Sequence, residues 1–145
     1  MEIIRRAILD PLGTLPQIRL PVDRLTLAKR RWRGVAEDGV EFGFDLDGPI
    51  FDGTPFFQTA TSTYFIAQKY ESVLEIRRPG IGGTGVGEAA RLGWIIGNLH
   101  FQIEITSTVI RVVDDPAMRL LFARESIDYS ACQRVFHPIH GGHQH

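Results

Sequence analysis

The alternation of apolar and polar residues divides the chain into two parts, and the first part has the period of β-structure. Three short β-like runs occur at Val22–Leu27, Lys29–Val35 and Glu41–Leu46. The turn residues Glu37-Asp38-Gly39 join the last two runs as a hairpin. A further apolar and aromatic run covers Thr63–Lys69, and the composition changes at about Tyr70. We therefore predict a β-rich N-terminal domain over residues 1–70.

In the second part, strand-like and helix-like patterns alternate. Apolar residues at intervals of three and four predict a helix over Gly87–Leu99, and Asp115 followed by Pro116 marks the start of a second helix. Four strands are predicted at Val73–Arg77, Phe101–Ile105, Val109–Val113 and Gln133–Phe136. The order β-α-β-β-α-β predicts a ferredoxin-like domain over residues 71–136 and an α+β class for the chain.

Residues 137–145 contain four of the five histidines. His137, His140, His143 and His145 are separated by Pro138, Ile139, Gly141, Gly142 and Gln144. Imidazole is a ligand for nickel, copper and zinc, so the spacing predicts a flexible tail that gathers a metal ion. The alternative is a disordered, glycine-rich terminus that happens to be rich in histidine.

Composition limits the classes of function. The formal net charge of −1 gives no electrostatic basis for binding nucleic acid. The single cysteine, Cys132, cannot form an intramolecular disulfide, and we predict that it is a small buried apolar residue in a protein of a reducing compartment. No stretch has the length of a membrane span or the pattern of a secretory signal, so we expect a cytoplasmic protein without a membrane partner.

A glycine-rich stretch matches a nucleotide-binding pattern. Gly80, Gly82 and Gly85 satisfy G-x-G-x-x-G between a strand and a helix, and Glu104 follows at about the distance of a ribose-binding acid. An antiparallel hairpin follows the helix, however, where a dinucleotide fold requires further parallel strands. We interpret the stretch as a connecting loop.

The fifth histidine, His100, stands where the first helix of the second part ends. One explanation is that the carbonyl end of the helix favours its cationic form. The other is metal binding, because a two-fold dimer brings two copies of the residue together on its axis. The tails could then close over one ion, with His143 and His145 as ligands and His140 as a further candidate.

Several of these residues carry a family resemblance. Gly97-Asn98-Leu99-His100 resembles the Gly-Asn-x-His signature of UreE-type urease accessory proteins, which are nickel metallochaperones. Phe136 and Pro138 resemble the ending of the family's last strand, and Gly142–His145 resembles its histidine-bearing tail. The stretch from Leu25 to Phe57 resembles the family's N-terminal β domain.

The resemblance implies a homodimer that binds Ni(II) through a pair of His100 side chains, with help from the tail histidines. Zn(II) and Cu(II) are the other ions that such a site accepts in vitro, and dimers can pair further around a shared ion. The N-terminal domain is then a protein-recognition domain, and the metal passes through an accessory GTPase to apo-urease. Leu99 and Gln102 replace the arginine and proline that are common around the signature.

Two other classes of function compete with this interpretation. A metal-dependent hydrolase is disfavoured because the chain contains neither H-E-x-x-H nor H-x-x-E-H, so we expect no enzyme. A general cytosolic buffer for nickel, copper or zinc requires the same ligands and no client. Retention of a GTPase partner would distinguish a chaperone from a buffer.

Overall fold

The structure is a computed structural model that describes residues 1–77 and 85–139. The chain divides into two compact units, Met1–Lys69 and Tyr70–His145. Each unit has its own apolar core. Because the described residues form both helices and sheets, the predicted α+β class is confirmed.

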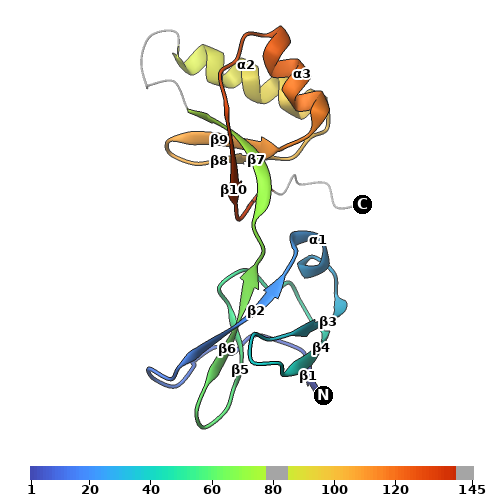
Figure 1. The fold of residues 1–145 in the computed structure, drawn as a ribbon, viewed down its shortest axis with the longest axis vertical. Helices are drawn as coiled ribbons and strands as arrows, with labels where there is room; N and C mark the ends of the chain where they lie inside the picture. Colours follow the sequence, from blue (N-terminus) through green and yellow to red (C-terminus); the bar gives the residue numbers. More distant parts are fainter. Residues whose placement is uncertain (78–84, 140–145) are drawn as a thin grey trace. The chain divides into compact units, whose positions relative to one another are not determined.

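Two three-stranded sheets form the N-terminal unit (Figure 1). The first has the order β1 (Glu2–Ile4), β4 (Glu41–Asp45) and β3 (Arg31–Val35), and the second has the order β2 (Gln17–Val22), β6 (Thr63–Gln68) and β5 (Pro55–Gln58). Both sheets contribute to one core, which includes Leu20, Phe42, Phe56 and Ile66. The unit is therefore held together by side chains that meet between the sheets.

The alternation along β3 decides which side chains enter this core. Trp32 lies directly opposite Phe44 of β4, and their rings stack with centroids 3.7 Å apart. Arg31 and Arg33, on either side of Trp32, are exposed, because successive side chains of a strand point to opposite faces. The sheet β1-β4-β3 thus has an inner face in the core and an outer face toward solvent.

One predicted strand of this unit is wrong over most of its length. Val22 ends β2, and Arg24–Leu27 forms a helical turn, α1, in place of the strand predicted over Val22–Leu27. The cause is Asp23, whose Oδ1 accepts a hydrogen bond from the Thr26 amide at 2.9 Å and so caps the turn. The sequence did not predict strands β1 and β5, nor any residue of β2 before Val22.

The C-terminal unit is a four-stranded antiparallel sheet with two helices on one face (Figure 1). Its elements in chain order are β7 (Glu71–Arg77), α2 (Gly85–Asn98), β8 (Ile103–Ile105), β9 (Val109–Val113), α3 (Pro116–Arg124) and β10 (Ser130–Arg134). The strand order is β10-β7-β9-β8. The core between the sheet and the helices includes Leu74, Ile96, Val112, Met118 and Phe122.

The start of α3 is confirmed as predicted. Asp115 Oδ1 accepts a hydrogen bond from the Ala117 amide at 2.8 Å, and Pro116 occupies the first turn. No helix within residues 1–77 and 85–139 is both long and apolar enough to cross a membrane. Of the glycine-rich stretch, Gly80 and Gly82 lie outside the described residues.

The last predicted strand is displaced. β10 ends at Arg134, whereas the sequence predicted a strand over Gln133–Phe136. The apolar Phe136, which suggested a longer strand, lies beyond the end of β10, and its side chain is fully buried.

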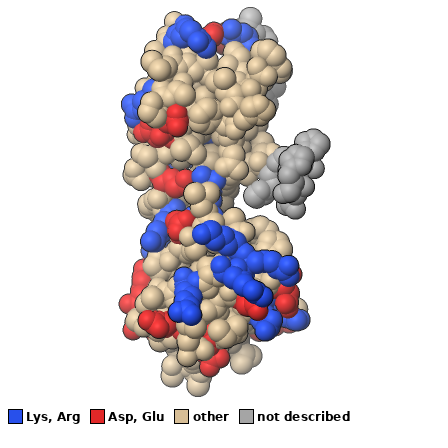
Figure 2. Space-filling model, turned by 90° about the vertical axis from the view of Figure 1, so that its right-hand side faces the viewer, with Lys and Arg blue, Asp and Glu red and all other residues tan. Residues whose placement is uncertain are grey.

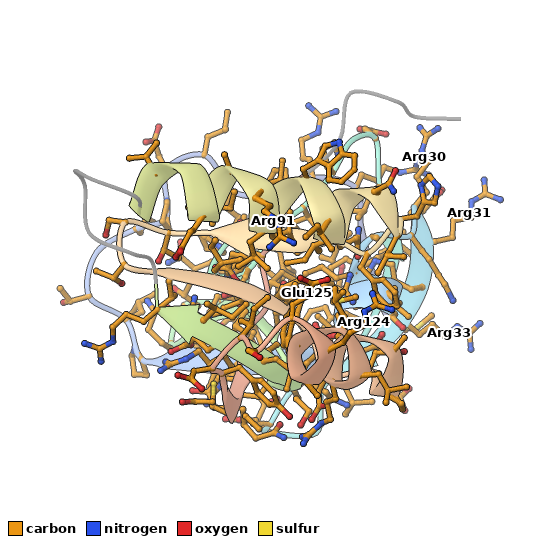
Figure 3. The ribbon with its side chains drawn as sticks, turned by 90° about the horizontal axis from the view of Figure 1, so that it is seen from above. Arg30, Arg31, Arg33, Arg91, Arg124 and Glu125 are labelled. Carbon is orange, nitrogen blue, oxygen red and sulfur yellow. The ribbon has the colours of Figure 1, made fainter. Side chains whose placement is uncertain are left out.

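The surface of the N-terminal unit carries its charges unevenly. Figure 2 shows Lys and Arg side chains gathered on one face of this unit. Three of its arginines, Arg30, Arg31 and Arg33, are labelled in Figure 3, where Arg31 and Arg33 point away from the unit, whereas Arg30 Nε donates a hydrogen bond to the Leu46 carbonyl at 3.0 Å.

Candidate metal centre

His100 lies just beyond the end of α2 in an unusual backbone conformation. Its φ is 63°, in the left-handed region, and its side chain is exposed. The His100 amide donates a hydrogen bond to the Gly97 carbonyl at 3.0 Å, so the residue terminates the helix. Glycine is the usual residue in this conformation, because a side chain adds strain of about 1 kcal/mol. Ser126, which follows α3, has the same left-handed conformation with a φ of 55°, so this conformation marks the end of a helix in both places.

Large apolar side chains are exposed on α2 and just beyond its end. Trp94 is 70% exposed and Leu99 is 45% exposed. They help to line a shallow hollow of about 310 Å³ between α2 and α3. Figure 3 shows Arg91, Arg124 and Glu125 at this hollow, and Arg91 Nη2 lies 2.9 Å from Glu125 Oε2. An exposed tryptophan beside an apolar neighbour is typical of a surface that another molecule covers.

Residues 135–139, which we call the C-terminal strap, cross the sheet face that has no helices. The strap starts after β10 at one edge of the sheet, and the Ile139 amide donates a hydrogen bond to the carbonyl of Ile103 in β8, at the other edge, at 2.8 Å. Phe136 is completely buried on the way. Three strand spacings of about 4.8 Å amount to roughly 14 Å, which five extended residues at about 3.3 Å each can span.

A buried carboxylate holds the strap. Glu104 is 8% exposed, and its Oε1 accepts a hydrogen bond from the His137 amide at 3.1 Å. Its Oε2 accepts one from Arg111 Nη1 at 3.2 Å. The first three residues of the predicted tail 137–145 are therefore bound to β8, which begins three residues after His100. The alternating pattern of β8 gives no indication of this role of Glu104.

The ionic network around Glu104 extends across the same sheet face. Arg111 Nε also lies 2.7 Å from Glu75 Oε2, which accepts a second hydrogen bond from Arg134 Nε. The hydrogen bond from Arg111, together with that from Arg134, lowers the pKa of Glu75 below its ordinary value. Both carboxylates are therefore occupied by arginines and are poor candidates for metal ligands.

Cys132 belongs to this network and not to the apolar core. Its side chain is half-buried, and Sγ lies 3.6 Å from Glu75 Oε2. The prediction of a buried apolar role is therefore wrong, because alternation along β10 places Cys132 opposite Val73, on the face that carries Glu75.

The predicted metal ligands divide into one described and three undescribed residues. His100 is described, whereas His140, His143 and His145 lie outside the described residues. Within residues 1–77 and 85–139, no group of three or more His, Cys, Asp or Glu side chains is placed to hold a metal ion. A site at His100 therefore needs ligands from beyond this part of one chain.

Comparisons with known proteins give the family context. Residues 71–145 match the family described as UreE urease accessory protein, C-terminal domain. The protein named urease accessory protein UreE from Bifidobacterium longum subsp. infantis is 32% identical over 91 residues, which cover 62% of this chain and 39% of that protein. Transient receptor potential cation channel subfamily M member 4 from Rattus norvegicus is 31% identical over 86 residues, which cover 57% of this chain and 6% of the channel. The chain thus spans less than half the length of either relative.

Proposed function

We propose that this chain, which belongs to the UreE family of urease accessory proteins, is a metallochaperone that delivers Ni(II) for assembly of the urease active site. The metal is held by the His100 side chains of two chains at a homodimer interface, and tail histidines assist. The nickel ion is the cargo. The protein itself carries out no reaction.

The observation that carries the proposal is the position of His100. Its imidazole is exposed at the end of a helix, in a backbone conformation that glycine would adopt at lower cost. A single imidazole is an inadequate nickel site, because Ni(II) takes four to six ligands. A site completed by a second chain and by the tail supplies those ligands without a closed cage.

The exposed apolar side chains support a dimer. Trp94 and Leu99 lie within six residues of His100 and offer a surface for a second copy. In a two-fold interface the same patch on both chains meets itself, so residues near the axis face their own copies. We propose that His100 lies near this axis, and that further pairing of dimers occurs around a shared ion.

The strap supports a role for the tail. The hydrogen bond from the Ile139 amide holds the residue before His140 at Ile103, which is three residues after His100. We propose that His140, His143 and His145 reach the ion from this starting point, because an extended chain advances about 3.3 Å per residue.

Delivery needs a site that releases its ion. Ligands at a subunit surface and on a tail can be exchanged one at a time, whereas a closed site buttressed by hydrogen bonds resists exchange. We propose that the receiving partners are a urease accessory GTPase and the apo-urease complex, and that the unit Tyr70–His145 is the ferredoxin-like domain of the family.

Calorimetric nickel titration tests the metal site. The variants are His100→Ala, a chain truncated after Ile139, and His137→Ala as a control for loss of a surface histidine. Truncation after Ile139 keeps the strap bonds to Ile103 and Glu104, so it removes only the candidate tail ligands. We expect His100→Ala to abolish the tightest site, truncation to weaken it, and the control to bind as the parent does.

The same titration and the oligomeric state can refute the proposal. A tightest site that survives His100→Ala, or that binds one ion per chain in a monomer, contradicts a shared His100 site. Sedimentation with and without nickel gives the oligomeric state.

The client is tested separately. The chain should retain the accessory GTPase in a pull-down and transfer radioactive nickel to apo-urease. A chain that binds nickel at His100 but does neither is a metal buffer.

A further inference from the structure

The outer face of the sheet β1-β4-β3 contains a hollow that the proposed nickel site does not use. It has a volume of about 570 Å³, and the residues around it include Ile3, Arg5, Arg31, Arg33, Gly43 and Asp45. All of them belong to the unit Met1–Lys69. The hollow is shallow and lies on a sheet face, so it suits a flat or extended ligand.

The floor of the hollow is backbone covered by the apolar side chains of Ile3 and Met1. Gly43 of β4 is buried and lies opposite Ile3, and a Cβ at position 43 would lie 2.8 Å from Ile3 Cδ1. The glycine therefore lets Ile3 lie across the sheet. Ile3 is nevertheless 52% exposed, so it offers an apolar contact at the centre of the hollow.

Positive charge surrounds this apolar centre. Asp45 pairs with two arginines, at 2.9 Å from Arg31 Nε and 3.4 Å from Arg5 Nη1. Arg33 forms no ion pair with any residue of the described ranges. Three guanidinium groups and one carboxylate leave an excess of two positive charges around the hollow.

The arginines have the spacing of an extended chain. Arg31 and Arg33 are two positions apart on β3 and share its outer face, so their backbones are about 6.6 Å apart. Figure 3 shows both side chains directed away from the unit. In an extended peptide, side chains at positions i and i+2 also share one face at this separation. Two carboxylates with one residue between them therefore match the two arginines.

We propose that this hollow binds an acidic, extended segment of a partner protein, in which two carboxylates separated by one residue pair with Arg31 and Arg33 and a neighbouring apolar side chain contacts Ile3. A nucleic acid is a poorer match, because an excess of two charges suits a few carboxylates and not a polyphosphate chain. The apolar centre at Ile3 also has no counterpart in a phosphate site. The surface is separate from the proposed nickel site, since the two lie in different units.

Binding of labelled peptides to the full chain tests the inference. The probe is a fluorescein-labelled peptide of alternating Glu and Leu, and its control has the same composition in a Glu-Glu-Leu-Leu repeat, in which no two Glu residues are two positions apart. Fluorescence anisotropy should show tighter binding of the alternating peptide. The double variant R31E/R33E should weaken that binding by more than about tenfold, because each charge-assisted pair is replaced by a repulsion.

Three controls distinguish loss of the proposed ion pairs from a general effect of charge and from a disturbed fold. Arg19→Glu reverses the charge of one exposed arginine, which pairs with Glu37 outside the hollow, and it should bind within about twofold of the parent. R31Q/R33Q removes both charges without adding repulsion, and it should also weaken binding. It therefore tests the inference even if charge reversal disturbs the fold. Nickel titration of both double variants should match the parent.

Three outcomes would overturn the inference. These are equal binding of the two peptides, equal binding by R31E/R33E and the parent, and displacement of the peptide by an equal concentration of inorganic phosphate. The last would mark a general anion site. None of them bears on nickel binding at His100, so failure of this inference leaves the proposed function intact.

Discussion

Replacing Glu104 by glutamine should release the C-terminal strap. The carboxylate accepts hydrogen bonds through both of its oxygens, from the His137 amide and from Arg111. A glutamine has one carbonyl oxygen, so it can satisfy only one of these donors, and its other end is itself a donor. The substitution keeps the size of the side chain, so the effect comes from hydrogen bonding and charge.

The expected loss of unfolding free energy follows from the two hydrogen bonds that the substitution alters. A hydrogen bond to a charged group contributes about 1.5–3 kcal/mol, and one between neutral groups contributes about 1 kcal/mol. Loss of one charge-assisted bond and conversion of the other to a neutral one together cost about 2–5 kcal/mol. For a unit of this size that corresponds to a fall in Tm of roughly 10–40 °C.

Two measurements check this prediction. Urea unfolding followed by far-ultraviolet circular dichroism reports on the C-terminal unit, because that unit contains α2 and α3, the two longer of the described helices. Hydrogen exchange at the His137 and Ile139 amides reports on the strap itself. Both amides should exchange faster in Glu104→Gln, whereas Glu88→Gln, a change at an exposed acid of α2, should alter stability by less than about 0.5 kcal/mol.

An unfolding midpoint that Glu104→Gln leaves unchanged would contradict this role of the carboxylate. So would a destabilised unit in which the two strap amides exchange in step with the rest of the sheet. In that case the carboxylate would support the unit as a whole and not the strap.

Three further predictions concern the C-terminal unit. His100→Gly should raise stability by up to about 1 kcal/mol in thermal unfolding while abolishing the tightest nickel site, since glycine adopts the left-handed φ of 63° without strain; a fall in Tm would contradict this. Phe136→Ala should lower the free energy of unfolding by about 3–5 kcal/mol, because its side chain is fully buried, and a loss under 1 kcal/mol in urea unfolding would count against a packed strap. Hydrogen bonds from Arg111 and Arg134 lower the pKa of Glu75 in the folded state, so the ionised carboxylate stabilises the unit at neutral pH and this stabilisation disappears as the pH falls below about 4. In urea unfolding, the free energy of unfolding should therefore fall less between neutral pH and acid in Glu75→Gln than in the parent, and equal falls would refute the linkage.

Local signals explain which elements the sequence could predict. The start of α3 was predictable because its cap and its proline are adjacent in sequence. The strands β3 and β4 were predictable because a short turn joins two alternating runs. The turn α1 could have been found from Asp23, whose partner Thr26 is only three residues away. In these cases the information lies within a few neighbouring residues.

The rest depends on partners that are distant in sequence. Strand β1 pairs with β4, about forty positions further along the chain, and its three residues carry too little pattern to identify it alone. Glu104 looks like an ordinary solvent-facing residue of an alternating strand, because the strap that bonds it comes from 33 positions further along the chain. His100 was found through its sequence context, but its left-handed backbone was not predictable from that context.

The chain has one apolar core before Lys69 and another after Tyr70. The proposed nickel ligands lie in the second unit, and the arginines proposed to bind an acidic peptide lie in the first. A protein built this way is modular, since selection or an engineer can exchange the recognition surface without repacking the interior that supports the metal ligands. Grafting residues 70–145 onto a different recognition unit should therefore redirect the cargo to a new recipient and leave the capacity to load it unchanged.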